Sequence, residues 1–298
     1  MNITVIGTAS KHFTFHVDQL PSPNESRRAK ALSSSVGGRG IMQAVQGARL
    51  GANVTLLCRF SEDTESADLI RMLLNENIRV LTIERSPLET SVNFGVFDDE
   101  KRHYFLTGGQ ASFDLRPNDI EPYAARIREC EVLLLEQNIP PDTMASILAL
   151  TALHNPFVIL NPAPPYRLPA NLYAYVSCIT PNADELSKLT GSADLEEGVA
   201  ILLSWGVKHV VVTLGDRGCF YAKQDESYFV EPFSIIPTDS SGAGDAFNAA
   251  LAVSIAKGKS MKESLIYANA VAALCATKNG CVESLPYLSD VENFIQEY

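Results

Sequence analysis

The chain has 298 residues, of which 46% are hydrophobic and 20% charged, a composition that predicts a folded globular protein with a sizeable core. Its formal net charge of −11 argues against binding to nucleic acids or to anionic membrane surfaces. Any anionic ligand must therefore be held by backbone amides and by a few local cations.

The cysteines and the first residues bear on the compartment. The six cysteines form no CxxC pair and no pattern of a small secreted domain, which indicates reduced thiols. No apolar run approaches the length of a transmembrane helix, and the first residues lack the basic segment of a signal peptide. We therefore expect a cytoplasmic protein whose first core strand is residues 3–7.

Short apolar strands alternate with helices along most of the chain. We expect strands at residues 3–7, 54–60, 78–83, 132–135, 157–160, 209–213, 219–222 and 227–231. We expect helices at 41–50, near 69–73, at 118–129, 141–153, 184–190 and 194–205, from 242 to 257, near 260–277 and at 289–297. Repeated strand–helix units predict an α/β fold, a doubly wound and mostly parallel sheet with helices on both faces.

Two segments do not fit this alternation, because their apolar residues alternate with polar ones as in half-exposed strands. The first is about 12–35 and leads into an expected flexible loop at 36–40. The second, about 90–108, holds two such runs joined by Asp-Asp-Glu-Lys, which predicts a hairpin. We expect both segments to form one small β-sheet, inserted into a single domain that spans 1–298.

A glycine-rich stretch from Asp239 to Asn248 separates an extended run from an alanine-rich helix. Gly242 and Gly244 allow the backbone to bend sharply. At a helix start their amides would be unpaired, which is a site for phosphate oxygens. Asp245 is the carboxylate inside this cradle, and a base beside an anion site suits phosphoryl transfer to an alcohol. Taken alone, the stretch is better explained as a capped helix after a tight turn.

Further motifs favour the functional interpretation. In their order and spacing they make the chain similar to the ribokinase-like (phosphofructokinase B type) carbohydrate kinases over essentially its whole length. The motifs are Gly37-Gly38-Arg39-Gly40, Leu160-Asn161-Pro162-Ala163-Pro164, Ile179 to Glu185, Thr213-Leu214-Gly215-Asp216-Arg217-Gly218 and the stretch from Asp239. The resemblance implies an ATP-dependent kinase that phosphorylates a hydroxyl of a sugar or sugar-like molecule, with the small sheet as a lid.

The resemblance also implies roles on the nucleotide side. Asp245 would be the base, and the amides of Gly242, Ala243 and Gly244 the anion hole. Asn182 and Glu185 would hold Mg²⁺-associated water, although Asn-x-x-Glu at a helix start also predicts a capping box. The expected ATP-binding residues are Thr213, Gly215, Asp216, Gly218 and, near the adenine, Asn269. For Asn269 a purely structural partner is an equal alternative.

A monovalent-cation site, expected to take K⁺, is implied by the same resemblance. Its residues would be Asp239, the backbone of Ser241, the loop Lys278-Asn279-Gly280 and Ser284. Most of these ligands would be carbonyl groups.

The acceptor side departs from the family pattern. The expected acceptor residues are Ser10, His12, Gly38, Arg39, Met42 and Asn138, together with Asp245. Other members carry Asn and Asp where this chain has Ser10 and His12, Lys at Arg39, Asn at Met42 and Glu at Asn138. A carboxylate can accept hydrogen bonds from two neighbouring sugar hydroxyls, and this chain has His12 and Asn138 where other members have carboxylates. We therefore expect ribose to be a poor substrate. An acceptor with an anionic group, such as a sugar acid, would suit Arg39 and His12, whereas a nearby carboxylate such as Asp18 could restore a ribose site.

Two alternatives remain open. A nucleoside kinase of the same fold would suit the apolar Met42, and a nucleotide-binding regulatory protein would have a degenerate acceptor pocket. The lid carries large apolar side chains, which a single thin sheet would leave exposed to solvent. We therefore expect a homodimer through the lid. Those side chains are Phe13, Phe15, Phe94 and Phe105.

Overall fold

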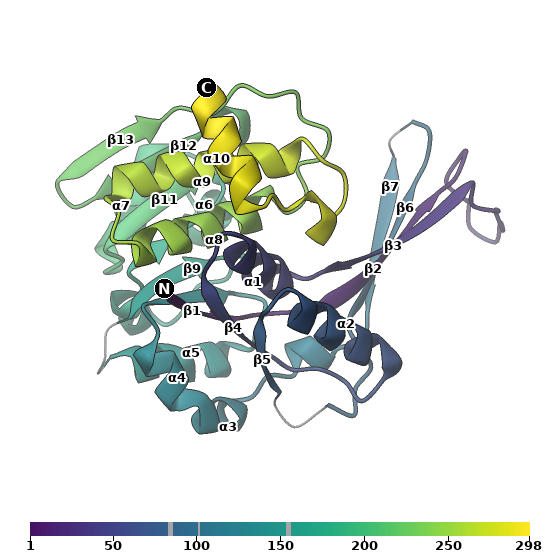
Figure 1. Ribbon diagram of the computed structural model, residues 1–298, viewed down its shortest axis with the longest axis horizontal. Coiled ribbons are helices and arrows are strands. Elements are labelled where there is room, and N and C mark those ends of the chain that lie inside the picture. The colour runs from purple at the N-terminus through teal and green to yellow at the C-terminus, as the bar shows by residue number, and fades with distance from the viewer. Residues whose placement is uncertain (83–85, 101, 153–155) are drawn as a thin grey trace.

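The computed structural model describes residues 1–82, 86–100, 102–152 and 156–298 (Figure 1). Within them, one sheet runs in the order β13-β12-β11-β10-β9-β8-β1-β4-β5. Its strands are β1 (Asn2–Ile6), β4 (Asn53–Cys58), β5 (Arg79–Thr82), β8 (Val132–Glu136), β9 (Phe157–Asn161), β10 (Cys178–Ile179), β11 (His209–Thr213), β12 (Cys219–Lys223) and β13 (Glu226–Val230). The strands from β5 to β11 are parallel, and β12 and β13 add an antiparallel edge.

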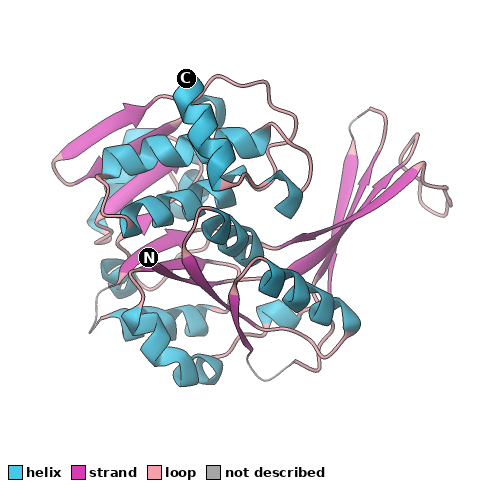
Figure 2. Cartoon of the chain, in the orientation of Figure 1, coloured by secondary structure: helices cyan, strands magenta, loops and turns pink. Residues whose placement is uncertain are grey.

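Helices cover both faces of this sheet (Figure 2), which confirms the predicted fold class. One core lies under α1 (Arg39–Arg49), α2 (Thr64–Asn75), α8 (Ala243–Ala256), α9 (Met261–Ala276) and α10 (Leu288–Glu297). The other lies under α3 (Pro117–Ile120), α4 (Ala124–Glu129), α5 (Pro141–Thr151), α6 (Ala183–Thr190) and α7 (Leu195–Ser204). Successive strand residues serve opposite cores, because strand side chains alternate between faces.

Helix α8 is buried along most of its length, from Ala246 to Ser254, between α1 and α9. A helix that is apolar on nearly every side is stable only inside a core. Its first turn emerges from this packing with Asp245, so the rest of the helix fixes that carboxylate in place.

A second sheet projects from the main body (Figures 1 and 2), and we call it the lid. It consists of β2 (Ser10–His16), β3 (Ala31–Gly37), β6 (Val92–Phe97) and β7 (His103–Gly108), in the order β3-β2-β6-β7. Strands β2 and β6 are parallel, and the outer pairs are antiparallel. The expectation of one small separate sheet is therefore confirmed.

Several local expectations were wrong. Residues 36–40 are not a flexible loop: β3 runs to Gly37, and α1 begins at Arg39. The single helix expected at 118–129 is broken into α3, a 3₁₀ turn and α4, because Pro122 interrupts it. The expected strand end at 83 and helix end at 153 lie outside the described residues, as does the side chain of Phe105.

The described residues include no helix that is both long enough and apolar enough to cross a bilayer.

Candidate active site

The carboxyl ends of the parallel strands meet at one edge of the main sheet, where doubly wound folds bind their ligands. There β8 ends at Glu136 and β9 at Asn161, and these two residues are paired in the sheet. Strand β1 continues through Gly7 and Thr8 into β2, so the same edge leads directly into the lid. Asp245 of α8 lies above it, with Oδ1 3.5 Å from the side-chain nitrogen of Asn161.

Asp245 has the surroundings of a general base. Its Oδ1 accepts a hydrogen bond of 2.9 Å from Nε2 of Gln43, a fully buried residue of α1. Burial raises the pKa of Asp245 to about 6, against the opposing effects of the Arg39 guanidinium and the Gln43 hydrogen bond. The carboxylate is therefore ionised at neutral pH and more basic than an exposed aspartate, as proton removal from a hydroxyl requires.

The helix start beside Asp245 matches only part of the expected anion hole. Gly242 is the N-cap of α8 at a φ of 81°, and no side chain caps this end. This left-handed conformation favours glycine, since any side chain there would be strained; a Cβ would also require the flexible end of Met42 to move. The amide of Ala243 donates to the carbonyl oxygen of Ser240 (3.2 Å), which occupies one of the three expected donors. The amides of Gly242 and Gly244 make no such bond to another described residue and remain available to an anion.

Asn182 and Glu185 form the capping box of α6. Asn182 Oδ1 accepts from the amide of Glu185, and Glu185 Oε2 accepts from the amide of Asn182, both at 2.8 Å. This is the structural alternative that the sequence left open. Burial raises the pKa of Glu185, and its carboxylate in turn helps to raise the pKa of Asp245. Glu185 therefore lies near enough to Asp245 to influence its pKa while it caps the helix.

The expected nucleotide-binding residues lie together after β11. Thr213 ends that strand, and Gly215 and Asp216 form the following 3₁₀ turn, which ends at Gly218. A bridge between Asn182 and Thr213 joins this loop to the start of α6. The Nδ2 of Asn269 donates to the carbonyl oxygens of Val230 (3.4 Å) and Glu231 (3.1 Å), as its structural alternative expects.

The expected cation-binding residues divide into two groups. Asp239, Ser241 and Gly280 line the same cavity as Asp245, and Asp239 Oδ1 accepts from the amide of Ser241 at 2.9 Å. Lys278 points its ammonium group toward Asp290 at 3.7 Å. The buried Ser284 donates to the carbonyl oxygen of Cys281 at 2.7 Å.

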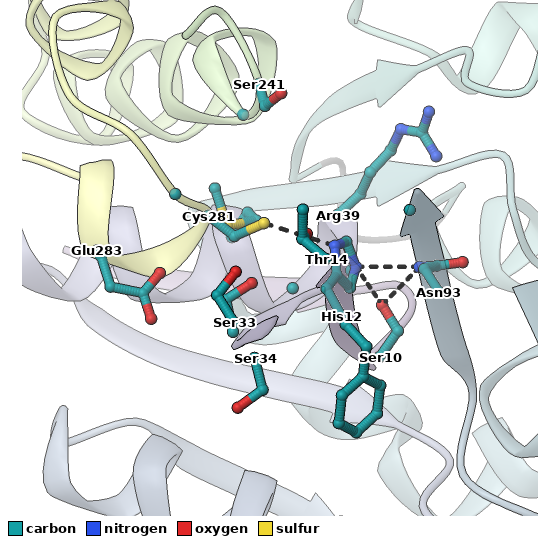
Figure 3. Close-up of a pocket in the computed structure, with 18 of the residues that line it drawn as sticks. Ser10, His12, Thr14, Ser33, Ser34, Arg39, Asn93, Ser241, Cys281 and Glu283 are labelled. Carbon is teal, nitrogen blue, oxygen red and sulfur yellow. Dashed lines mark hydrogen bonds between the residues drawn. The ribbon is translucent and has the colours of Figure 1, made fainter. Parts of the chain in front are cut away.

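A cavity of about 1110 Å³ lies between the lid and the main body (Figure 3). All the residues expected to bind the acceptor line it, which are Ser10, His12, Gly38, Arg39, Met42, Asn138 and Asp245. The lid turns its polar face to this cavity. By the register of its strands, the side chains on that face include those of His12, Thr14, Ser33, Ser35, Asn93 and Thr107.

His12 is held in the wall of the cavity as a neutral ring (Figure 3). Its Nε2 lies 2.9 Å from Ser10 Oγ and 3.0 Å from Asn93 Nδ2. Because an amide nitrogen only donates, Nε2 accepts and the ring proton lies on Nδ1, which faces Cys281 Sγ at 3.5 Å. Burial lowers the pKa of His12, although the nearby Glu283 opposes this effect. His12 therefore offers no positive charge to an anionic acceptor at neutral pH.

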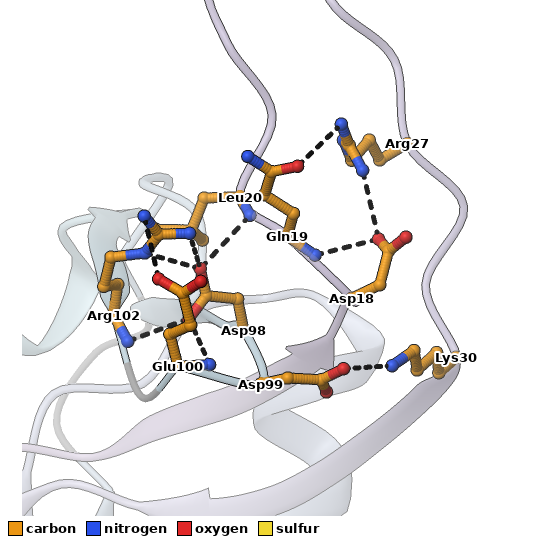
Figure 4. Close-up of polar contacts among 9 residues, drawn as sticks. All are labelled: Asp18, Gln19, Leu20, Arg27, Lys30, Asp98, Asp99, Glu100 and Arg102. Atoms are coloured by element: carbon orange, nitrogen blue, oxygen red, sulfur yellow. Dashed lines mark hydrogen bonds and ion pairs between the residues drawn. The ribbon is translucent and has the colours of Figure 1, made fainter.

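Asp18 does not take part in this cavity. It lies in the loop between β2 and β3 (Figure 4), where it accepts from the amide of Gln19 at 2.8 Å and pairs with Arg27 at 3.3 Å. The acidic side chain that does lie in the cavity wall next to His12 is that of Glu283.

Sequence patterns did not single out several residues of this site. Asn93 and Glu283 carry no motif and reach the cavity only through the pairing of the lid and the packing of a loop against it. Gln43 and Glu136 lie in largely apolar segments, where a polar residue among buried neighbours was the available signal.

Comparison with known proteins gives this geometry a family. The profile of the pfkB family carbohydrate kinases matches residues 1–288. A ribokinase of Bacillus subtilis is 28% identical over 294 residues and a deoxyribokinase of Salmonella typhi 26% over 303, each alignment covering 99% of both chains. The crystal structure of ribokinase from Thermotoga maritima superposes with a TM-score of 0.89 at 28% identity, covering 99% of each chain. The chain therefore belongs to the pfkB family of carbohydrate kinases and transfers a phosphoryl group to an acceptor hydroxyl.

Proposed function

We propose that this kinase transfers the γ-phosphoryl group of ATP to a hydroxyl of a neutral, sugar-like acceptor, with Asp245 as the general base. The observation that carries this proposal is the position of Asp245, whose carboxylate lies at the open start of α8 and in the cavity of the acceptor residues. A hydroxyl bound there would meet a base and an anion site together.

The nucleotide is supported by the relatives and by the loops around α6 and β11. The ribokinase of Arabidopsis thaliana, whose structure was determined with ribose and ATP, is 26% identical and superposes with a TM-score of 0.86. Asn182, Glu185 and the loop from Thr213 to Gly218 would hold the nucleotide and its metal at the same sheet edge.

Magnesium fits the donors at the start of α6. The capping box uses Oε2 of Glu185 and leaves Oε1 outside it. Glu185 is close enough to Arg39 and Asp245 that Arg39 opposes the effect of burial on the pKa of Glu185, and Glu185 adds to the effect of burial on the pKa of Asp245. A carboxylate oxygen that contacts metal-bound water is a usual magnesium partner. When bound, Mg²⁺ neutralises charge on the transferred phosphate. The residues of this chain position the base, the acceptor and the nucleotide.

Charge in the cavity favours a neutral acceptor. Three carboxylates, those of Asp239, Asp245 and Glu283, line it together with the cation Arg39. His12 adds no charge because burial lowers its pKa. These three carboxylates would therefore repel a negatively charged group on the acceptor more strongly than Arg39 would attract it.

A panel of acceptors tests the proposal. ADP release would be measured with Mg-ATP over neutral sugars, deoxy sugars, sugar acids and nucleosides. We expect the highest kcat/KM with a neutral sugar or sugar alcohol. Preference for a nucleoside or a sugar acid would replace the proposed acceptor class. No acceptor-dependent ADP release with any compound would favour a nucleotide-binding regulatory protein instead.

A further inference from the structure

A second carboxyl group lies beneath the candidate reaction centre. Glu136 ends β8 and is completely buried. Its Oε1 accepts a hydrogen bond from the backbone amide of Thr8, and its Oε2 has no hydrogen-bond partner in the described part of the chain. The space around it is full: a Cβ on Gly7 would lie 2.8 Å from Cγ of Glu136 and 2.9 Å from Cα of Gly40. Glu136 is therefore fixed under the cavity floor with one oxygen unpaired.

The titratable groups around Glu136 come from several elements. Arg39 of α1 and Asp245 of α8 are the charged ones, and the thiol of Cys58 and the phenol of Tyr166 also face it. Burial raises the pKa of Glu136 to about 7; the Thr8 hydrogen bond and Arg39 oppose this, and Asp245 adds to it. Because the pKa of Asp245 is about 6, Asp245 loses its proton first and Glu136 second.

Arg39 is placed to respond to this second ionisation. It is the only arginine or lysine among the described residues that line the cavity, and its guanidinium forms no hydrogen bond or ion pair with another described residue. A buried carboxylate with an unpaired oxygen is costly, so ionised Glu136 attracts the nearest cation. Under the proposed function, a nucleotide phosphate at the start of α8 would lie in the cavity that Arg39 lines and would compete for the same cation.

On the basis of the proposed kinase function, we propose that Glu136 is a positioning residue that controls Arg39. Its neutral carboxyl leaves Arg39 to the phosphate groups of the nucleotide, and its ionised carboxylate draws Arg39 toward the cavity floor. Nucleotide binding then weakens as pH rises through the range in which Glu136 ionises. Loss of activity at lower pH belongs to Asp245 instead.

Binding of a non-hydrolysable ATP analogue with an imido bridge, in the presence of Mg²⁺, tests this without an acceptor. Titration calorimetry from about pH 6.5 to about pH 8.5 should show roughly tenfold weaker binding to the wild type at the higher pH, the value of one charge-assisted contact. Glu136→Gln should bind equally well at both. Arg39→Gln should bind the analogue weakly at both pH values, because it lacks the guanidinium for which the phosphate groups and Glu136 compete.

Glu131→Gln is the matched control. Glu131 precedes β8 at the opposite end of the strand, is exposed, and accepts from the amide of Asn2 at 2.7 Å, so this variant should follow the wild type. Thermal unfolding shows whether Glu136 titrates in the folded protein. Its pKa is raised above the unfolded value, so its contribution to stability is lost as pH rises toward about 7. As pH rises toward about 7, the melting temperature of the wild type should therefore fall relative to that of Glu136→Gln.

The outcomes separate the two proposals. Equal pH dependence of binding in the wild type and Glu136→Gln would overturn the control of Arg39, even if the melting curves differ, because Glu136 would then be structural only. Absence of analogue binding to the wild type at every pH would remove the proposed function and this inference with it.

Discussion

Asp245 is the residue on which the proposed chemistry depends. Asp245→Asn keeps the shape of the side chain and an oxygen that can accept the Gln43 hydrogen bond, but its amide cannot take up the proton of the acceptor hydroxyl. We expect it to fold and bind ATP, and to lose a factor of roughly 10²–10⁴ in turnover. Asp142→Asn is the matched control, since Asp142 also lies in a first helical turn, that of α5, and does not line the cavity. Turnover of Asp245→Asn close to that of the control would exclude Asp245 as the base.

The pKa of Asp245 also predicts a pH dependence. The base must be ionised, and burial raises its pKa to about 6, so kcat/KM for the best acceptor should rise with pH through about 6. Steady-state rates at fixed saturating Mg-ATP would measure this. A rate that stays constant below pH 6 would show that another group takes the proton.

His12 predicts weak activity on ribose. Its Nε2 is already occupied by Ser10 and Asn93, whereas an aspartate at this position could accept two hydrogen bonds from a diol. We expect kcat/KM for ribose below about 10⁴ M⁻¹s⁻¹ and a clear increase in His12→Asp. Efficient ribose phosphorylation by the wild type would mean that another wall residue, such as Glu283, clamps the diol. The kcat/KM for ribose would then be compared between Glu283→Gln and the control Asp18→Asn, which alters a residue outside the cavity. A loss in Glu283→Gln alone would identify Glu283 as that residue.

At this scale the sequence predicted residues that belong to motifs and missed those that act through packing. Asp245, Arg39 and His12 were found because motifs place them at the cavity. Nothing local to Asn93 or Glu136 shows that one reaches His12 across the lid and the other Thr8 across the main sheet. Such contacts depend on strand register between distant segments, which local patterns do not specify.

The loops at 239–241 and 278–284 form the element expected to bind a monovalent cation. Asp239, Ser241 and Gly280 lie at the cavity next to the start of α8, so a bound cation would order the amides there. We expect activity to require Mg²⁺ and to be higher in K⁺ than in choline at equal ionic strength. Identical rates in the two salts would exclude a cation requirement. Rates in Na⁺ would show whether ion size matters.

The outer face of the lid predicts a dimer. The strand register places Phe13, Phe15 and Phe94 on the face opposite His12, although Phe13 also reaches the cavity lining. The exposed members of this face are Leu32 (60%), Tyr104 (56%) and Leu106 (68%). An apolar sheet face of this kind is typical of an interface. Light scattering should show a homodimer at micromolar concentration that Leu106→Lys converts to a monomer. Leu74→Lys, at an exposed leucine (57%) of α2, should leave the dimer intact. A wild-type monomer would exclude this role.

Among the elements, long periodic segments were predictable and short or weakly patterned ones were not. Strand β3 contains three consecutive serines and forms because Ser10 to His16 pair with it. Strand β10 has only two residues and is defined by its neighbours β9 and β11. In both cases the pairing partner, rather than the segment itself, determines the structure.

For the whole molecule, the sequence was sufficient to predict the architecture, because buried parallel strands and amphipathic helices alternate regularly. The residues expected to bind the acceptor all line one cavity, and their role in binding stays a prediction. The faces of the lid could not be assigned, because that requires the alignment of four strands from two distant segments of the chain.

Because the lid has two different faces, this chain tolerates substitutions in β2 more readily than changes in its length. Removal of one residue between Ser10 and His16 would reverse every later side chain of β2, because strand side chains alternate with a period of two. Removal of Lys11, for example, would turn Phe15 to the cavity face and move the ring of His12 away from its place opposite Asn93. Substitutions on one face can therefore accumulate without disturbing the other, whereas a single-residue insertion or deletion would exchange the surface that recognises the acceptor with the surface proposed to recognise a second copy.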